Sequence, residues 1–185
     1  MRVIAGTARG RRLKELQGMD TRPTTDKVKE SLFNIVQFDI EGRKVLDLFG
    51  GTGQLGIEAL SRGAESCTFV DQSRQAVAVI QENLKATGFA NQGRVQQGDA
   101  LAFLAGCRER YNLIFLDPPY HTELLETCIF SVAKFDILSE YGIMVCESAD
   151  SAQLPELAAP YEKGREYRYG KIKLTVYHRQ GETTL

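Results

Sequence analysis

The chain has 185 residues, which is enough for one domain with a complete core and a small additional segment. Apolar residues make up 43% of it and charged residues 25%, a composition typical of a soluble globular protein. No apolar run approaches the ~20 residues that span a bilayer. Residues 1–6 lack the apolar core of a secretory signal, so we expect a cytoplasmic protein that does not contact a membrane.

The four cysteines do not form a recognisable metal or redox motif. Cys67, Cys107, Cys128 and Cys146 are far apart, and no two of them form a Cys-x-x-Cys pair. Neither histidine has a ligand-like spacing to them. We therefore expect reduced structural thiols and no metal site.

The net charge of −1 is unevenly distributed along the chain. Residues 1–30 carry eight basic and four acidic side chains, a net charge of +4, which leaves −5 for the remainder. A basic end is a plausible binding site for nucleic-acid phosphates, although a solvated surface segment has the same composition. The candidate RNA-binding residues are Arg9, Arg11, Arg12, Lys14 and Arg22.

The first 40 residues are predicted to form a small N-terminal extension. Residues 2–5 and 11–16 read as two short strands of a hairpin whose turn contains glycine. A helix should follow, with Thr24 or Thr25 as its N-cap and an apolar face that continues to about residue 38. We expect a main domain over residues 41–185.

From residue 44 onward, strand and helix patterns alternate. This alternation predicts an α/β fold with a doubly wound, mostly parallel sheet. A hairpin at the C-terminus should add an antiparallel strand. The predicted strands are residues 45–49, 66–70, 94–97, 111–116, 143–146, 162–169 and 171–178. The predicted helices are residues 54–62, 73–87, 100–107 and a segment through 124–132.

The sequence Asp117-Pro118-Pro119-Tyr120 follows the apolar strand 111–116. Proline cannot donate to a sheet ladder, so the backbone leaves the strand here in a stiff loop. Asp117 and the Pro118 carbonyl could accept hydrogen bonds from an exocyclic amine of a nucleobase, and Tyr120 could stack on the base. A plain turn with a packed tyrosine also fits these four residues alone.

A glycine loop follows the first strand of the main domain. Gly51-Thr52-Gly53-Gln54-Leu55-Gly56 matches the dinucleotide pattern G-x-G-x-x-G, which by itself would admit a nicotinamide enzyme. Asp47 at the end of that strand is an unfavourable neighbour for a pyrophosphate. It suits a cationic ligand such as S-adenosylmethionine, which carries a sulfonium and an amino group.

Further carboxylates follow the next two strands. Asp71 could accept both ribose hydroxyls of such a ligand, and Asp99 could accept from its adenine amine. Because the ends of parallel strands meet at one sheet edge, Asp47, Asp71, Asp99 and Asp117 are predicted to form a row there.

Several motifs together carry a family resemblance that covers nearly the whole chain. They are Arg2-Val3-Ile4-Ala5-Gly6 with Arg9-Gly10-Arg11, Arg22-Pro23-Thr24, residues 47–53, residues 55–64 and Asp117-Pro118-Pro119-Tyr120. With these the chain resembles class I S-adenosylmethionine-dependent methyltransferases. In particular it is similar to the RNA-guanine-N2 methyltransferases of bacterial small-subunit ribosomal RNA.

The resemblance implies a fold, a cofactor site and a reaction. It implies a seven-stranded Rossmann-like sheet with the last strand pair reversed, and chemistry at Asp117, Pro118 and Tyr120. Asp71 departs from the Glu that is usual in the family, which makes this carboxylate one methylene shorter. The implied S-adenosylmethionine-binding residues are Asp47, Phe49, Gly51, Gly53, Asp71, Gln72, Asp99 and Ala100.

We therefore expect an enzyme that transfers a methyl group from S-adenosylmethionine to the exocyclic N2 amine of a guanine in 16S ribosomal RNA. The expected partner is ribosomal RNA within a small-subunit particle, and the expected state is a monomer. Three alternatives remain open at this point: an adenine-N6 methyltransferase, a nicotinamide-dependent oxidoreductase, and a catalytically idle RNA-binding module.

Overall fold

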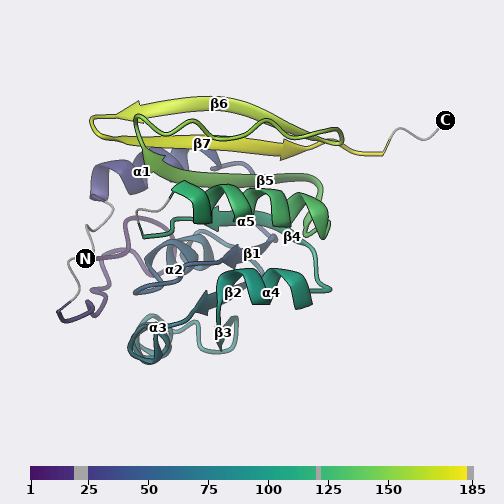
Figure 1. Ribbon diagram of the computed structural model, residues 1–185. Helices are drawn as coiled ribbons and strands as arrows, with labels where there is room; N and C mark the ends of the chain where they lie inside the picture. Colours follow the sequence, from purple (N-terminus) through teal and green to yellow (C-terminus); the bar gives the residue numbers. More distant parts are fainter. Residues whose placement is uncertain (19–24, 120–121, 183–185) are drawn as a thin grey trace.

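The computed structural model describes residues 1–18, 25–119 and 122–182 of the chain. Seven strands form one sheet, and helices cover both of its faces (Figure 1). The helices are α1 (Asp26–Ile35), α2 (Gln54–Ser61), α3 (Arg74–Thr87), α4 (Ala100–Gly106) and α5 (Thr122–Lys134). The strands are β1 (Lys44–Asp47), β2 (Ser66–Asp71), β3 (Gly93–Gln97), β4 (Tyr111–Leu116), β5 (Leu138–Ala149), β6 (Tyr161–Tyr169) and β7 (Ile172–Arg179).

The strand order in the sheet is β3-β2-β1-β4-β5-β7-β6 (Figure 1). The five strands from β3 to β5 are parallel, whereas β7 runs antiparallel to both β5 and β6. The order reverses between β1 and β4, which is where open α/β sheets form their binding crevice. The predicted doubly wound, mostly parallel sheet with one antiparallel strand is confirmed.

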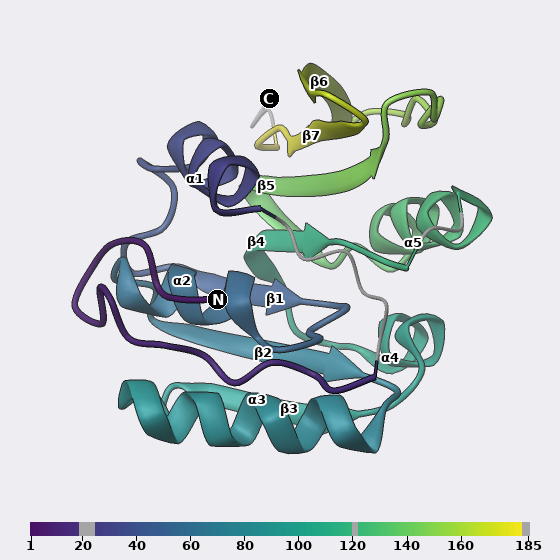
Figure 2. The same ribbon diagram turned by 90° about the vertical axis from the view of Figure 1, so that its left-hand side faces the viewer.

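The sheet separates two apolar cores. On one face, α1, α2 and α3 pack on the sheet through buried residues such as Phe33, Ile57 and Ile80. On the other face, α4 and α5 pack through residues such as Leu104 and Ile129 (Figure 2). None of the helices in the described part of the chain is long and apolar enough to cross a membrane.

Local sequence signals mark several of the helix ends. The Thr25 side chain accepts a hydrogen bond from Val28 N, and the Ser73 side chain accepts one from Ala76 N. Gly88 ends α3 in the left-handed conformation at φ 85°, which glycine adopts without steric cost. The first helix was expected to reach about residue 38 but ends at Ile35. Just beyond that end, the side-chain amide of Gln37 donates to the Asn34 carbonyl.

Strand β5 is much longer than the predicted residues 143–146. Its register with β7 runs from Ile143 to Ala149, so the partner strand extends the pairing past the apolar centre. That extension depends on a strand about 30 residues later in the chain, which a local apolar pattern does not report.

The predicted N-terminal hairpin is shorter than expected. Its two arms meet in a single antiparallel bridge between Arg2 and Arg12. The amides of Ile4 and Ala5 instead donate to the Glu58 carboxylate of α2, at 2.8 and 2.9 Å. Backbone donors that are bound to a side chain cannot extend a ladder, which explains the missing strands.

The N-terminal segment shares a core with the rest of the chain. Val3, Leu13 and Leu32 lie in the same buried cluster as Val45 of β1 and Phe69 of β2. The division of the chain at residue 40 stays a prediction.

Candidate functional site

Four acidic residues follow the carboxyl ends of four adjacent strands. Along the sheet edge they lie in the order Asp99, Asp71, Asp47 and Asp117, at the ends of β3, β2, β1 and β4. Residues Asp47 and Phe115 are register partners, and Leu48 N donates to Phe115 O at 3.2 Å. The structure therefore brings the predicted row to one edge, with Asp47 and the Asp117 loop at the β1–β4 crevice.

Asp47 is buried beneath the glycine loop, with 2% of its surface exposed. Its Oδ2 accepts a hydrogen bond from Gly56 N at 3.1 Å, in the first turn of α2. Burial raises the pKa of Asp47 to about 8, the Gly56 bond opposes this shift, and the charges of Asp117 and Asp71 add to it. Burial therefore disfavours the charged form of this carboxyl when no cation is bound.

Asp71 organises the turn that follows β2 and the glycine loop beside it. Its Oδ2 accepts from Gly51 N and its Oδ1 from Ser73 N, both at 2.9 Å. The residue is only partly buried. Gln72 next to it is exposed.

Glycine is required at different positions of the loop for different structural reasons. Gly51 and Gly53 have positive φ of 57° and 81°, which a side chain would strain. A Cβ on Gly51 would meet nothing closer than the Phe49 carbonyl at 4.0 Å, so this backbone leaves room for a ligand. A Cβ on Gly56 would lie 2.2 Å from the Phe69 ring, so this glycine lets α2 pack directly on β2.

Asp99 is exposed and serves as the N-cap of α4, accepting from Ala102 N at 2.9 Å. Ala100 behind it is buried. Phe49 at the other side of the crevice is half-buried against the α4–α5 core. These three residues lie along the edge where the sequence predicts a cofactor, and their contacts with it stay a prediction.

Asp117 and Pro118 are both partly buried at the end of β4. Asp117 is near enough to Asp47 to raise the pKa of that carboxyl. Tyr120, the third predicted catalytic residue, lies outside the described residues.

The candidate RNA-binding residues lie on the N-terminal segment. Arg9, Arg11, Arg12 and Lys14 are exposed. Arg11 Nη1 donates to the Ala86 carbonyl at 3.3 Å, and Lys14 Nζ pairs with Glu82 at 2.7 Å. Arg22 lies outside the described residues.

The carboxylates at the crevice fit a cationic ligand. In dinucleotide folds the pyrophosphate binds free amides at the helix N-terminus after the glycine loop. Here Gly56 N of that first turn already donates to Asp47, and Asp71 and Asp117 add negative charge nearby. A sulfonium or ammonium group would gain from these carboxylates, whereas a pyrophosphate would be repelled.

Sequence reasoning missed a buried charged cluster under the N-terminal segment. Glu58 and Lys29 have fully buried side chains, with Lys29 Nζ 3.8 Å from Glu58 Oε2 and Arg62 Nε 2.9 Å from Oε1. Burial lowers the pKa of Lys29, and the Glu58 charge opposes this shift. A glutamate inside the apolar run Leu55–Leu60 was the available sequence signal.

A second missed residue is Asn83 of α3. Its side chain accepts from Lys14 N at 2.7 Å and donates to Lys14 O at 3.0 Å. It also donates to Thr52 O at 2.9 Å, so it joins the basic segment to the glycine loop. No local pattern marks it, because its partners lie 31 and 69 residues away.

This strand order, with carboxylates where other Rossmann-like proteins hold a pyrophosphate, is that of the class I methyltransferases that use S-adenosylmethionine. The chain belongs to the family described as "Conserved hypothetical protein 95", whose model matches residues 1–178.

Named relatives agree with this assignment. The Bacillus subtilis protein "Putative rRNA methyltransferase YlbH" is 40% identical over 98% of this chain and 100% of its own length. The Escherichia coli protein "Ribosomal RNA small subunit methyltransferase D" is 35% identical over 98% of this chain and 91% of its own length. The solved structure "Putative methyltransferase yhhF from Escherichia coli" has a TM-score of 0.88 at 36% identity, covering 98% and 99% of the two chains.

Proposed function

We propose that this protein transfers a methyl group from S-adenosylmethionine to the exocyclic N2 amine of a guanine in small-subunit ribosomal RNA. The observation that carries the proposal is the position of Asp117 and Pro118 at the β1–β4 crevice, beside the buried Asp47 and the glycine loop. The relatives named as small-subunit methyltransferases support this choice of RNA.

The predicted cofactor residues would hold S-adenosylmethionine along the row of strand ends. This ligand supplies an electrophilic methyl group on a sulfonium. Asp47 and Asp71 would favour its positive charge, and Gly51 would allow the backbone to approach it closely. Asp99, at the outer end of the row, would accept from the adenine amine.

The target nitrogen is a poor nucleophile because its lone pair is delocalised into the guanine ring. Asp117 and the Pro118 carbonyl would accept its two N–H bonds and favour a nitrogen with an available lone pair. As the carbon–nitrogen bond forms and the carbon–sulfur bond breaks, the nitrogen loses one proton, which Asp117 can accept. Holding nitrogen and methyl carbon in line at about 3–3.5 Å would supply much of the rate.

The basic residues of the N-terminal segment would hold the RNA by its phosphates. Such contacts set the register of the RNA without reading its sequence. A target base that is stacked must first be flipped into the crevice. Because the segment is short, we propose that the substrate is a small-subunit particle in the cytoplasm, bound by a monomer.

The test is methyl transfer from labelled S-adenosylmethionine to small-subunit particles and RNA from cells that lack this protein. Nucleoside analysis should find N2-methylguanosine. N6-methyladenosine would overturn the choice of base. If neither the particles nor the RNA became labelled, the proposal would be overturned.

Asp117→Ala tests the assignment of the catalytic carboxylate. The variant should lose transfer while its affinity for S-adenosylmethionine changes little, because Asp117 contacts the amine. Asp39→Asn, a change away from the sheet edge, is the control. Retained activity in Asp117→Ala would contradict the proposed role.

A further inference from the structure

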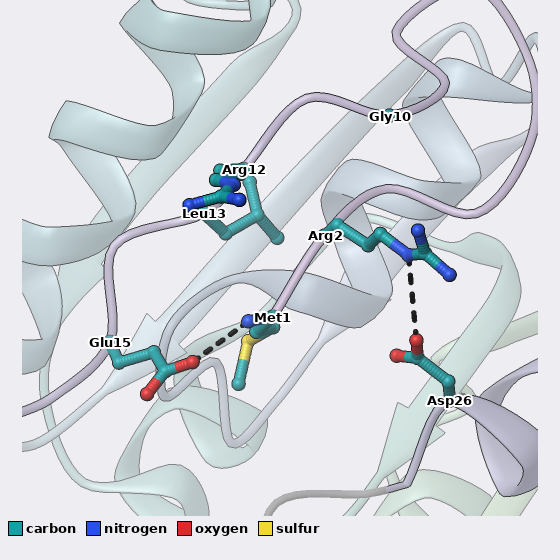
Figure 3. Close-up of a pocket in the computed structure, with 7 residues that line it drawn as sticks. All are labelled: Met1, Arg2, Gly10, Arg12, Leu13, Glu15 and Asp26. Carbon is teal, nitrogen blue, oxygen red and sulfur yellow. Dashed lines mark hydrogen bonds and ion pairs between the residues drawn. The ribbon is translucent and has the colours of Figure 1, made fainter.

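The N-terminal segment and the start of α1 line an open hollow of about 660 Å³ (Figure 3). That volume lies within the roughly 300–1,000 Å³ range of pockets that hold small ligands. The residues that line it are Met1, Arg2, Gly10, Arg12, Leu13, Glu15 and Asp26. We propose that this hollow is a subsite for one nucleotide that flanks the methylated base, held by its phosphate at Arg2 and Arg12. The proposal rests on the proposed function in RNA methylation.

Arg2 and Arg12 face each other in the single antiparallel bridge of the segment. Both side chains are exposed, and both line the hollow. In Figure 3 the two guanidinium groups point to different sides, that of Arg2 toward Asp26 and that of Arg12 to the side of Leu13. A phosphate in the hollow would gain one charge-assisted contact from each guanidinium group once both side chains turn toward it.

The charges already present in the hollow leave the arginines available. Arg2 Nε lies 3.6 Å from Asp26 Oδ2, and this pair is 66% and 52% exposed, so it is worth little in water. The Met1 nitrogen pairs with Glu15 at 2.8 Å (Figure 3). Among the described residues, the acidic side chains of the hollow pair with Arg2 and with the Met1 nitrogen, and neither pairs with Arg12. Asp26 is therefore a weak competitor that an RNA phosphate can displace from Arg2.

The walls of the hollow are fixed by backbone contacts. Lys29 Nζ donates to Arg2 O at 2.6 Å, Val3 N donates to Arg11 O at 2.9 Å, and Leu13 N donates to Met1 O at 3.0 Å. Only side chains would need to move when a nucleotide enters. A preformed site of this kind loses little conformational freedom on binding.

The hollow adjoins the glycine loop but is distinct from the crevice. Thr52 Oγ1 donates to Met1 Sδ at 3.2 Å, so the Met1 side chain links one wall of the hollow to the loop. The target base would be held at Asp117, on the β1–β4 side of the same loop. The hollow would then take a neighbouring nucleotide of the same strand.

Salt-dependent binding tests the subsite. The probe is a short single-stranded RNA that contains the guanine methylated by the wild-type protein, and the variants are Arg2→Gln, Arg12→Gln and Asp26→Asn. Arg108→Gln, an exposed change outside the hollow, is the matched control. Each arginine variant should weaken binding at low salt and reduce the slope of log affinity against log salt by about 0.7, the loss of one phosphate contact on a single strand.

Asp26→Asn should have the opposite effect and tighten binding about 2- to 5-fold, because it removes the competitor from Arg2. A tightened complex cannot arise from a misfolded protein, so this arm keeps the test decisive. If wild-type protein binds the RNA but the arginine variants keep the slope of Arg108→Gln, the subsite is wrong. If wild-type protein methylates neither RNA nor particles, the proposed function itself fails.

Discussion

Replacing Asp47 with asparagine is expected to stabilise the ligand-free protein, and increasingly so as the pH rises. The buried Asp47 carboxyl has a pKa of about 8 in the folded protein, against 3.8 as its ordinary value. The folded state therefore binds more protons than the unfolded state between these two values. The stability contributed by this group falls as the pH rises through that window.

The magnitude follows from the two pKa values. Each unit of difference corresponds to about 1.4 kcal/mol, so full ionisation of Asp47 costs the folded state up to about 6 kcal/mol. Between about pH 6 and pH 9, this cost grows by about 3 kcal/mol. Asparagine can still accept the Gly56 N–H bond but never ionises. The stability of Asp47→Asn should therefore not include this pH-dependent ionisation cost.

Urea unfolding at about pH 6 and pH 9 measures the effect. The free-energy advantage of Asp47→Asn over wild type should grow by about 3 kcal/mol, equivalent to about 6–12 °C in Tm for a chain of this size. Asp39→Asn controls for the general loss of one negative charge. Wild-type and Asp47→Asn stabilities that stay parallel across this pH range would refute a buried, protonated Asp47.

Three further changes have defined outcomes. S-adenosylmethionine binding near pH 7 should release up to one proton, because the positive charge of the ligand favours ionised Asp47. Calorimetry in two buffers of different ionisation enthalpy measures this release. Equal heats of binding in the two buffers would contradict it. Glu58→Ala should cost about 3–5 kcal/mol in urea unfolding, because it leaves Lys29 buried without its partner; a cost below 1 kcal/mol would show that the cluster is solvated. Gly56→Ala should cost about 1–3 kcal/mol, because its Cβ would overlap the Phe69 ring. Gly106→Ala, where a Cβ meets nothing, should cost nothing, and equal costs for the two alanines would exclude the packing explanation.

The sheet and the edge row were predictable because their signals are local. Ser73 and Gly88 mark the ends of one helix within its own sequence, and the structure confirms both. Asp47, Asp71 and Asp117 each stand directly after an apolar run. Parallel strands bring the ends of such runs to one edge, so no long-range information is needed to place the row.

Other features depend on partners that are distant in the sequence. The burial of Asp47 and its raised pKa result from packing of α2 over the loop, which a pattern of residue types does not give. The shortened N-terminal hairpin results from amides that bind Glu58 more than 50 residues later. Asn83 reads as an ordinary helix residue until both of its backbone partners are known.

The Glu58 contacts determine how experiments can separate the proposed RNA binding from the proposed catalysis. A deletion of the N-terminal segment would remove the amides of Ile4 and Ala5 and leave their acceptor carboxylate short of partners in the protein interior. Lost activity in such a truncated chain would then report a damaged fold, and would be misread as lost RNA contact. The proposed RNA-binding segment and the proposed catalytic edge therefore depend on the same packing, and exposed single-residue changes are the means to examine them separately.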